Sequence, residues 1–441
     1  MASERRRMRL REAHITLIDC DHRTPPASEE GYPYVAIPQL RQGRIDLSDV
    51  RRIAHEHFVD WTRKAKPLAN DVVLSRRCNP GETAFVPPNL EFALGQNLVL
   101  LRADGTKVYP PFLRWLLRGP EWWEQVEKFL NVGAVFDSLK CADVPNFELR
   151  IPPLNEQCAI AHILGTLDDK IELDRRMNET LEAMARALFK SWFVDFDPVR
   201  AKSEGRDPGL PKPIADMFPD SFEDSELGQI PKGWRCSNLR EVTAKIASGA
   251  TPRGGGSVYI PEGVALIRSQ NVYDSHFVWD GLARITEAAA DALRGVTVEH
   301  GDILLNITGA SILRTCVVDP DVLPARVNQH VCIIRPAAEI PTRYVHLHLL
   351  QPSTRSFLMG MDAGASRQAV TKGHIESVPL VIPEVAVLEI FASLMCPLFR
   401  AVTKHTSESR SLACIRDTLL PKLISGELQV RDAERFIGRG V

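Results

Sequence analysis

The sequence predicts an α/β protein made of two copies of one unit, in which a globular domain is followed by a long helix. Several segments match one another with an offset of about 230 residues, as an internal repeat does. Val144–Pro153 matches Ile375–Glu384, and Asp71–Ser75 matches Asp302–Asn306. Apolar residues then recur at three- and four-residue spacing after each copy, which predicts amphipathic helices. We therefore expect two α/β domains separated by two long antiparallel coiled-coil helices, related by a pseudo-two-fold internal repeat.

The matched strands also indicate where the domains begin and end. Gln96–Arg102 matches Gln329–Arg335, and small shifts of the offset are what loop insertions would produce. We expect the first domain over residues 1–150 and the second over residues 234–383.

The helices should cover residues 151–196 and 384–428, which makes each much longer than the mean helix of about 11–12 residues. A helix of this length needs a partner, and the other copy supplies one. Polar residues occupy the same two positions in both stripes, where they would fix register at some cost in stability. These polar seam residues are Asp174, Asn178, His405 and Ser409.

Three features interrupt the repeat. Residues 197–233 are rich in proline and glycine with mixed charge, which predicts an extended linker. Pro397 predicts a kink in the second helix, and Pro421 predicts its end. Residues 429–441 remain as a tail.

Length and composition favour a soluble protein of two or three domains. The chain has 441 residues, of which 44% are hydrophobic and 25% are charged. It has no run of about 18 apolar residues and no apolar stretch after the basic start Met1–Arg7. The nine cysteines include no C-x-x-C pair, so we expect unpaired thiols in a reducing compartment. The expected location is the cytoplasm.

The motifs of an enzyme are missing from the sequence. It contains no G-x-x-x-x-G-K-[ST] phosphate loop and no Asp/Asn-Pro-Pro-aromatic tetrad of the kind that amino-methyltransferases use. Asp168–Lys170 is similar to the end of a nuclease motif, but we interpret it as solvated charge on the helix. His55–His57 and His346–His348 lack the further ligand of a zinc site. We expect no catalytic residue, metal or cofactor on this chain.

Several segments resemble the specificity subunit of a type I restriction-modification system, and together they span essentially the whole chain. They occur in order and at the spacing of the repeat. The first unit departs from the family pattern because it lacks the Gly-Trp start found before the second domain. The segments are Ile151–Gln157, Gly165–Ile171, Ala187–Phe196, Leu227–Trp234 and Leu419–Leu428.

The resemblance implies a subunit without catalysis of its own. Each domain would be a target-recognition domain that reads one half of a split, asymmetric site on double-stranded DNA. The helices would set the gap and dock two methyltransferase subunits, and motor-nuclease subunits would join for restriction. S-adenosylmethionine, ATP and Mg are then expected on these partners. The expected spacer and docking residues are Leu164, Leu167, Ile171, Asn178, Leu181, Leu188, Trp192, Leu398, Val402, Leu412 and Leu419.

Basic and amide side chains gather on matching parts of the two domains. Arginine reads guanine, asparagine and glutamine read adenine, and lysine and arginine also hold phosphates. The predicted DNA-binding residues of the first domain are Arg41, Arg44, Arg63, Lys64, Arg76, Arg77 and Asn79. Those of the second domain are Arg268, Gln270, Asn271, Asn306, Thr308, Arg367 and Gln368.

The net charge leaves a second hypothesis open. With 54 Lys and Arg against 56 Asp and Glu the net charge is −2, whereas a protein that binds nucleic acid alone is usually basic. Either the basic groups cluster locally or partner chains supply much of the phosphate contact. The alternative is a repeat-built protein–protein scaffold without DNA specificity. A strong salt dependence of DNA binding would favour DNA recognition.

Overall fold

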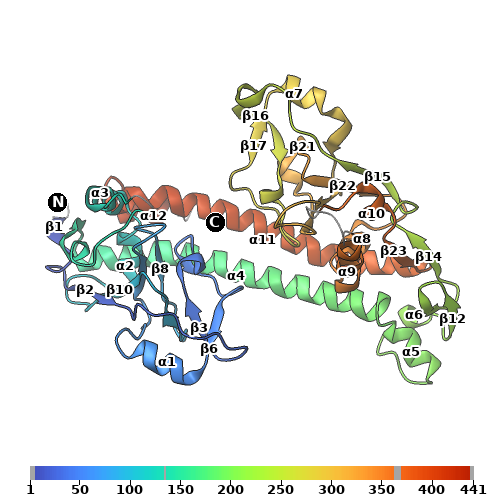
Figure 1. Ribbon diagram of the computed structural model, residues 1–441, viewed down its shortest axis with the longest axis horizontal. Helices are drawn as coiled ribbons and strands as arrows, with labels where there is room; N and C mark the ends of the chain where they lie inside the picture. The colour runs from blue at the N-terminus through green and yellow to red at the C-terminus, as the bar shows by residue number, and fades with distance from the viewer. Residues whose placement is uncertain (1–4, 134–135, 362–368, 438–441) are drawn as a thin grey trace. The chain divides into compact units, whose positions relative to one another are not determined.

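The computed structural model describes residues 5–133, 136–361 and 369–437. The chain divides into two compact units. Unit 1 comprises Met1–Leu173 and Glu408–Val441, and unit 2 comprises Asp174–Ser407. Each unit holds one globular domain and part of each of two long helices, α4 (Leu154–Phe193) and α11 (Val385–Ser425), drawn in green and red in Figure 1.

The domain of unit 1 is built on a four-stranded antiparallel sheet in the order β2-β10-β7-β8. In the central strand, Val99 and Leu101 pack toward the helices, whereas Leu98 and Leu100 pack against a second, smaller sheet. Because neighbouring side chains point to opposite faces and both faces are covered, the strand reads as a continuous apolar run. The strands are β2 (Ile15–Asp19), β7 (Val72–Ser75), β8 (Thr83–Phe85) and β10 (Leu98–Ala103).

The smaller sheet of unit 1 has the order β6-β3-β9, with β3 antiparallel to β6 and parallel to β9. A separate antiparallel pair, β1 with β11, joins the start of the domain to its end. The elements are β1 (Arg6–Arg9), β3 (Tyr32–Val35), η1 (Ile37–Gln39), β4 (Leu40–Arg41), β5 (Arg44–Ile45), β6 (Arg51–Ile53), α1 (His55–Thr62), β9 (Ala93–Leu94), α2 (Pro110–Leu116), α3 (Pro120–Phe129), η2 (Val144–Asn146) and β11 (Glu148–Ile151).

The domain of unit 2 repeats this plan. Its four-stranded sheet has the order β15-β22-β19-β20, and β22 again buries alternate side chains on the two faces. Cys332 and Ile334 face the helices, whereas Val331 and Ile333 face the second sheet. The strands are β15 (Thr243–Ser248), β19 (Ile303–Asn306), β20 (Thr315–Val317) and β22 (Val331–Pro336).

The second sheet of unit 2 has one more strand than its counterpart, in the order β17-β16-β21-β18. The pair β14 with β23 takes the place of β1 with β11. The elements are β14 (Arg235–Asn238), η3 (Gly255–Val258), β16 (Tyr259–Ile267), η4 (Ser269–Asn271), β17 (Ala283–Ile285), α7 (Glu287–Ala292), η5 (Arg294–Val296), β18 (Thr297–Val298), η6 (Pro320–Val322), β21 (Ala325–Val327), α8 (Thr342–Leu349), α9 (Pro352–Gly360), α10 (Lys372–Glu376) and β23 (Pro379–Ile382).

The internal repeat and the α/β fold class are therefore confirmed. A matched ion pair illustrates the repeat at the level of side chains. Arg102 on β10 pairs with the buried Asp71 at 2.7 Å, and Arg335 on β22 pairs with the buried Asp302, also at 2.7 Å. Each pair ties a central strand to the turn before its neighbouring strand.

The two long helices pack side by side and antiparallel within each unit. In unit 1, Leu164 and Leu167 of α4 share a core with Leu412 and Leu419 of α11. In unit 2, the later turns of α4 share a core with the first turns of α11. The predicted helix pair is confirmed. Most side chains of the two predicted stripes are buried or half-buried along it.

One expectation about the connecting segments is wrong. Residues 197–233 are not an extended linker, because they fold into two helices and a hairpin, and Phe218 is buried. Helix α11 runs through both Pro397 and Pro421 and ends at Ser425. The tail contains a further helix. The added elements are α5 (Asp197–Ser203), α6 (Lys212–Ala215), β12 (Phe222–Ser225), β13 (Gly228–Pro231) and α12 (Val430–Ile437).

Helix α11 is long and apolar enough, by length and composition alone, to cross a membrane. The core helix of a globular protein meets the same criterion. On α11, Phe391 and Met395 are buried in the core of unit 2, and Leu419 and Leu423 are buried in the core of unit 1. These buried side chains account for part of the hydropathy of this helix.

Candidate nucleic-acid interface

Two predicted base-reading amides lie inside the second domain. Asn306 ends β19 and is fully buried, where its Nδ2 donates to the Ser269 carbonyl at 2.9 Å and to Ser311 Oγ at 3.1 Å. Asn271 is equally buried, and its Nδ2 donates to the Val278 carbonyl at 2.9 Å. Both amides hold the loops that follow the strands. The prediction that they contact DNA is wrong, because neither side chain reaches the surface.

The interpretation of Asp168 as solvated charge is wrong. Asp168 lies on α4 and is only 3% exposed. Arg44, from the hairpin β4–β5, pairs with its carboxylate at 3.0 Å and donates to its carbonyl at 2.7 Å. Arg44 also pairs with Glu172, one turn further along the helix. Its guanidinium therefore fastens the first domain to α4.

Two more guanidinium groups complete this ion cluster in unit 1. Arg114 of α2 lies 3.4 Å from the Asp168 carboxylate, and Arg416 of α11 lies 2.6 Å from it. Burial by itself raises the pKa of Asp168, but Arg44, Arg114 and Arg416 together outweigh it and hold the pKa below its ordinary value. One carboxylate thus joins the domain and both long helices.

The matching junction of unit 2 is aromatic. Phe193 of α4 lies 4.9 Å from Phe391 of α11 and 5.0 Å from Tyr344 of α8, measured between ring centroids. Arg343 of α8 places its guanidinium carbon 3.7 Å from the ring centroid of Phe399. Edge-to-face rings at these distances bury a large apolar area. The two junctions therefore differ, because that of unit 1 includes a buried ion cluster and that of unit 2 includes a group of packed rings.

The predicted polar seam lies where the helices meet in unit 2. Asn178 Oδ1 is 3.0 Å from His405 Nδ1, and Asn178 Nδ2 donates to Thr406 Oγ1 at 3.2 Å. Asp174 is fully buried. A seam of this kind favours one register of the two helices over a slipped one.

The predicted spacer residues divide into two groups by exposure. Leu164, Leu167, Trp192, Leu412 and Leu419 are buried and hold the helices and domains together. The others are half-buried along the helices. They are Ile171, Asn178, Leu181, Leu188, Leu398 and Val402.

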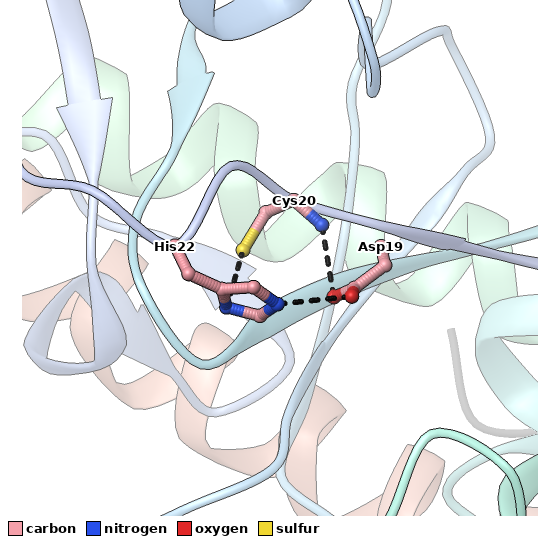
Figure 2. Close-up of side chains that lie close together, drawn as sticks. All are labelled: Asp19, Cys20 and His22. Atoms are coloured by element: carbon pink, nitrogen blue, oxygen red, sulfur yellow. Dashed lines mark hydrogen bonds and ion pairs between the residues drawn. The ribbon is translucent and has the colours of Figure 1, made fainter.

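Lys64 and Arg76 face a hydrogen-bonded turn that follows β2. Figure 2 shows the turn, in which Asp19 accepts from the Cys20 backbone at 3.0 Å and lies 3.0 Å from His22 Nε2. The ligand atoms of Asp19, Cys20 and His22 lie within 4.8 Å of one another, as at a metal site. However, burial raises the pKa of the Cys20 thiol to about 11.

Two positively charged side chains also lie next to this turn. Lys64 Nζ lies 3.6 Å and Arg76 Nη2 lies 4.0 Å from the Asp19 carboxylate. A protonated thiol is a poor metal ligand, and the negative charge of the Asp19 carboxylate is already balanced by these two cations. The turn is therefore better explained as a structural ion cluster. Lys64 and Arg76 therefore already interact with the Asp19 carboxylate within the protein.

The remaining predicted side chains lie at or near the surface. Arg41 pairs with Asp46 at 2.9 Å, and Arg63 pairs with Asp60. Arg268 is half-buried and donates to the Gly281 carbonyl at 2.6 Å. Thr308 Oγ1 lies 2.6 Å from His330 Nδ1.

The exposed members of the set are Arg41, Arg63, Lys64, Arg77, Asn79 and Gln270. Arg367 and Gln368 lie outside the described residues.

A groove of about 630 Å³ in the first domain brings one predicted residue together with several that sequence reasoning missed. Its wall includes Asn79, and the strands β3 and β6 supply Tyr34 and Arg51. Its polar lining also includes Thr24, Gln39, Asp49 and Gln96. Gln96 belongs to the matched segment before β10, so the repeat itself is the signal that could have identified it.

Comparisons with known proteins agree with this architecture. A family model described as Type I restriction modification DNA specificity domain matches residues 21–183. The chain is 25% identical over 403 residues to the Type I restriction enzyme HindI specificity subunit of Haemophilus influenzae, covering 81% of this chain and 86% of that protein. It is 26% identical over 307 residues to the Type I restriction enzyme MjaIX specificity subunit of Methanocaldococcus jannaschii, covering 69% of this chain and 66% of that protein.

A solved structure supports the fold independently. The crystal structure of the type I restriction-modification system S subunit from M. genitalium superposes with a TM-score of 0.55 at 17% identity. The match covers 96% of each chain. The two domains and the two long helices therefore recur together in a known architecture.

Proposed function

Because the chain is a DNA specificity subunit of the type I restriction-modification family, we propose that each of its two domains reads one half of a split, asymmetric DNA site. The target-recognition domains are residues 1–150 and 234–383. The observation that carries this proposal is the repeated sheet order with different side chains on its loops. A repeated scaffold presents two equivalent reading surfaces, and different side chains select different bases.

In this proposal the helices set the gap between the half-sites. Both α4 and α11 are continuous, with 40 and 41 residues. Two reading modules on a stiff spacer bind a two-part site with an effective concentration set by geometry, so each half can be weak by itself. The alternative of a scaffold without DNA specificity is set aside by the family to which the chain belongs.

The catalytic work belongs to the partners. Methyltransferase subunits with S-adenosylmethionine would methylate adenine, and motor-nuclease subunits with ATP and Mg would cleave DNA. The methyltransferase subunits would dock on exposed faces of the helices, where Met177 and Met184 of α4 are 42% and 54% exposed. A net charge of −2 fits a subunit whose partners supply much of the phosphate contact. The expected location is the cytoplasm, where the DNA is.

The first prediction concerns methylation in cells. Cells that carry this gene with its partner methyltransferase gene should contain methylated adenines at one split motif, and the motif should vanish when this gene is deleted. Mapping modified adenines across the genome measures both half-sites at once. If the partner is active with another specificity chain and this chain yields no motif, the proposed function is wrong.

The second prediction concerns the gap. Four residues inserted near Asp174–Asn178 in α4, with four more near His405–Ser409 in α11, add about 6 Å at 1.5 Å per residue. Since DNA rises about 3.4 Å per base pair, the tolerated gap should grow by one or two base pairs while both half-sites stay the same. Methylation mapping of the variant measures the gap. An unchanged gap in an active variant would contradict the role of the helices as spacer.

A further inference from the structure

Each domain holds one exposed glutamine in the same place, and a threonine binds it in both. Gln96 comes just before β10, and Gln329 comes just before β22, the matching central strand. Gln96 Nε2 donates to Thr24 Oγ1 at 2.9 Å. In the second domain, Thr251 Oγ1 donates to Gln329 Oε1 at 2.5 Å. Both threonines follow the strand that pairs with the central strand, β2 in one domain and β15 in the other.

The threonine leaves each amide with one donor and one acceptor to spare. An amide has two N–H groups and two lone pairs on oxygen. Gln96 uses one N–H on Thr24, so the second N–H and the oxygen remain. Gln329 uses one lone pair on Thr251, and its nitrogen lies 3.1 Å from His330 Nε2. A second lone pair and a second N–H therefore remain on Gln329 as well.

The surroundings of both glutamines are polar and open. In the first domain, Gln96 lines the groove of about 630 Å³ together with Arg51 and Asn79. The Tyr34 hydroxyl accepts from the Gln96 backbone at 3.2 Å and fixes the start of the strand. In the second domain, His330 beside Gln329 is held by Thr308 at 2.6 Å. Side chains that can pair with base edges thus gather around each glutamine.

We propose that Gln96 and Gln329 are base-reading residues that each recognise an adenine, one in each half-site, and that Thr24 and Thr251 position their amides. This inference rests on the proposed function. Adenine presents its N6 amino donor and N7 acceptor in the major groove, which match the spare acceptor and donor of each amide. Fixing the amide plane beforehand lowers the entropy lost on binding.

The threonine–glutamine pairs contribute little to the stability of the fold. All four side chains are exposed, so the threonine–glutamine hydrogen bonds lie at the surface and are not part of a hydrophobic core. A surface substitution of this kind ordinarily changes the free energy of unfolding by about 0.5 kcal/mol or less. The occurrence of the same pair in both domains, on different loop sequences, points to a shared task at the reading surface.

The test uses the full chain assembled with its methyltransferase subunits. Methylation rates are measured on duplex oligonucleotides in which each position of the mapped motif carries each of the four bases in turn. In the Gln96→Ala variant, the preference for adenine at one position of one half-site should fall roughly ten- to a hundredfold, with the other half-site unchanged. Gln329→Ala should do the same in the other half-site only.

Two further variants separate positioning from folding. Thr24→Val should lower the same base preference as Gln96→Ala to a smaller extent, with an unchanged melting temperature. Gln229→Ala changes an exposed glutamine on β13, away from both central strands, and should alter no base preference.

The outcomes distinguish the inference from the function on which it rests. If the wild-type complex methylates a split motif and both glutamine variants keep every base preference, the assignment of Gln96 and Gln329 is wrong while the function stands. If Gln96→Ala lowers methylation equally on all oligonucleotides, the residue either contacts the sugar-phosphate backbone of DNA or stabilises the domain. The assignment is then again wrong. If the wild-type complex methylates no motif, the proposed function itself fails.

Discussion

Replacing Asp168 with alanine is expected to destabilise the chain by about 3–5 kcal/mol, one of the two largest effects of any single substitution that we predict. The carboxylate is almost completely buried and pairs with Arg44, Arg114 and Arg416. Without it, three partly buried guanidinium groups would repel one another. Equilibrium unfolding of the full chain in urea measures the loss, and hydrogen exchange should locate the loosened segments in unit 1.

The neighbouring residue provides a matched control. Asp169 has the same charge and lies on the same helix, but it is exposed. Asp169→Ala should change the free energy of unfolding by about 0.5 kcal/mol or less. Equal effects of the two substitutions would contradict the ion cluster.

The stabilising effect of Asp168 should also depend on pH in a defined direction. Its pKa in the folded chain lies below the ordinary value. A carboxyl group of this kind stabilises the folded state above its unfolded pKa of about 3.9, and the effect is lost as the pH falls through the folded pKa. The difference in free energy of unfolding between the wild type and Asp168→Asn should be constant from about pH 5 to pH 8 and shrink below about pH 4. A difference that grows on acidification would contradict this sign.

Replacing Phe391 with alanine should destabilise the chain by a similar amount, about 3–5 kcal/mol, for a different reason. The ring is fully buried and contacts Phe189, Trp192, Phe193 and Tyr344. Its removal leaves a cavity between α4, α8 and α11. Urea unfolding measures the loss, and hydrogen exchange should place it in unit 2.

The control for this cavity lies one turn further along α11. Leu394 is 36% exposed, so Leu394→Ala should cost much less than Phe391→Ala. The effect of Phe391→Ala should also stay constant below pH 4, where that of Asp168→Asn shrinks. If both effects change with pH in the same way, the two domains are not fastened by different chemistry.

The contrast between the junctions bears on function. If the helices set the gap, each domain must hold its orientation on them for the half-sites to be read together. In unit 1 the buried Asp168 ion cluster is one part of that junction, and in unit 2 a group of packed rings is one part of it. Substitution of Asp168 should therefore disturb the half-site read by the first domain, and substitution of Phe391 the half-site read by the second.

The candidate site was predictable only in part. Arg44 and Arg77 are both arginines in a basic stretch, and nothing local distinguishes them. The fold brings Asp168 and Glu172 to Arg44 and leaves Arg77 exposed. Similarly, Asn306 is the last residue of β19 and Arg76 comes directly after β7, but the loops of the second domain close over Asn306. Burial of a polar side chain depends on partners supplied by distant segments.

The sequence by itself determined the repeat, two strands of each central sheet and the extent of the long helices. These features follow from hydrophobic periodicity, which is a local property and appears twice in the chain. The tertiary structure alone decided which polar side chains face inward and which remain exposed. The reason is that a charge or an amide is buried only where a partner satisfies it. For Asp168 that partner is Arg416, 248 residues further along the chain.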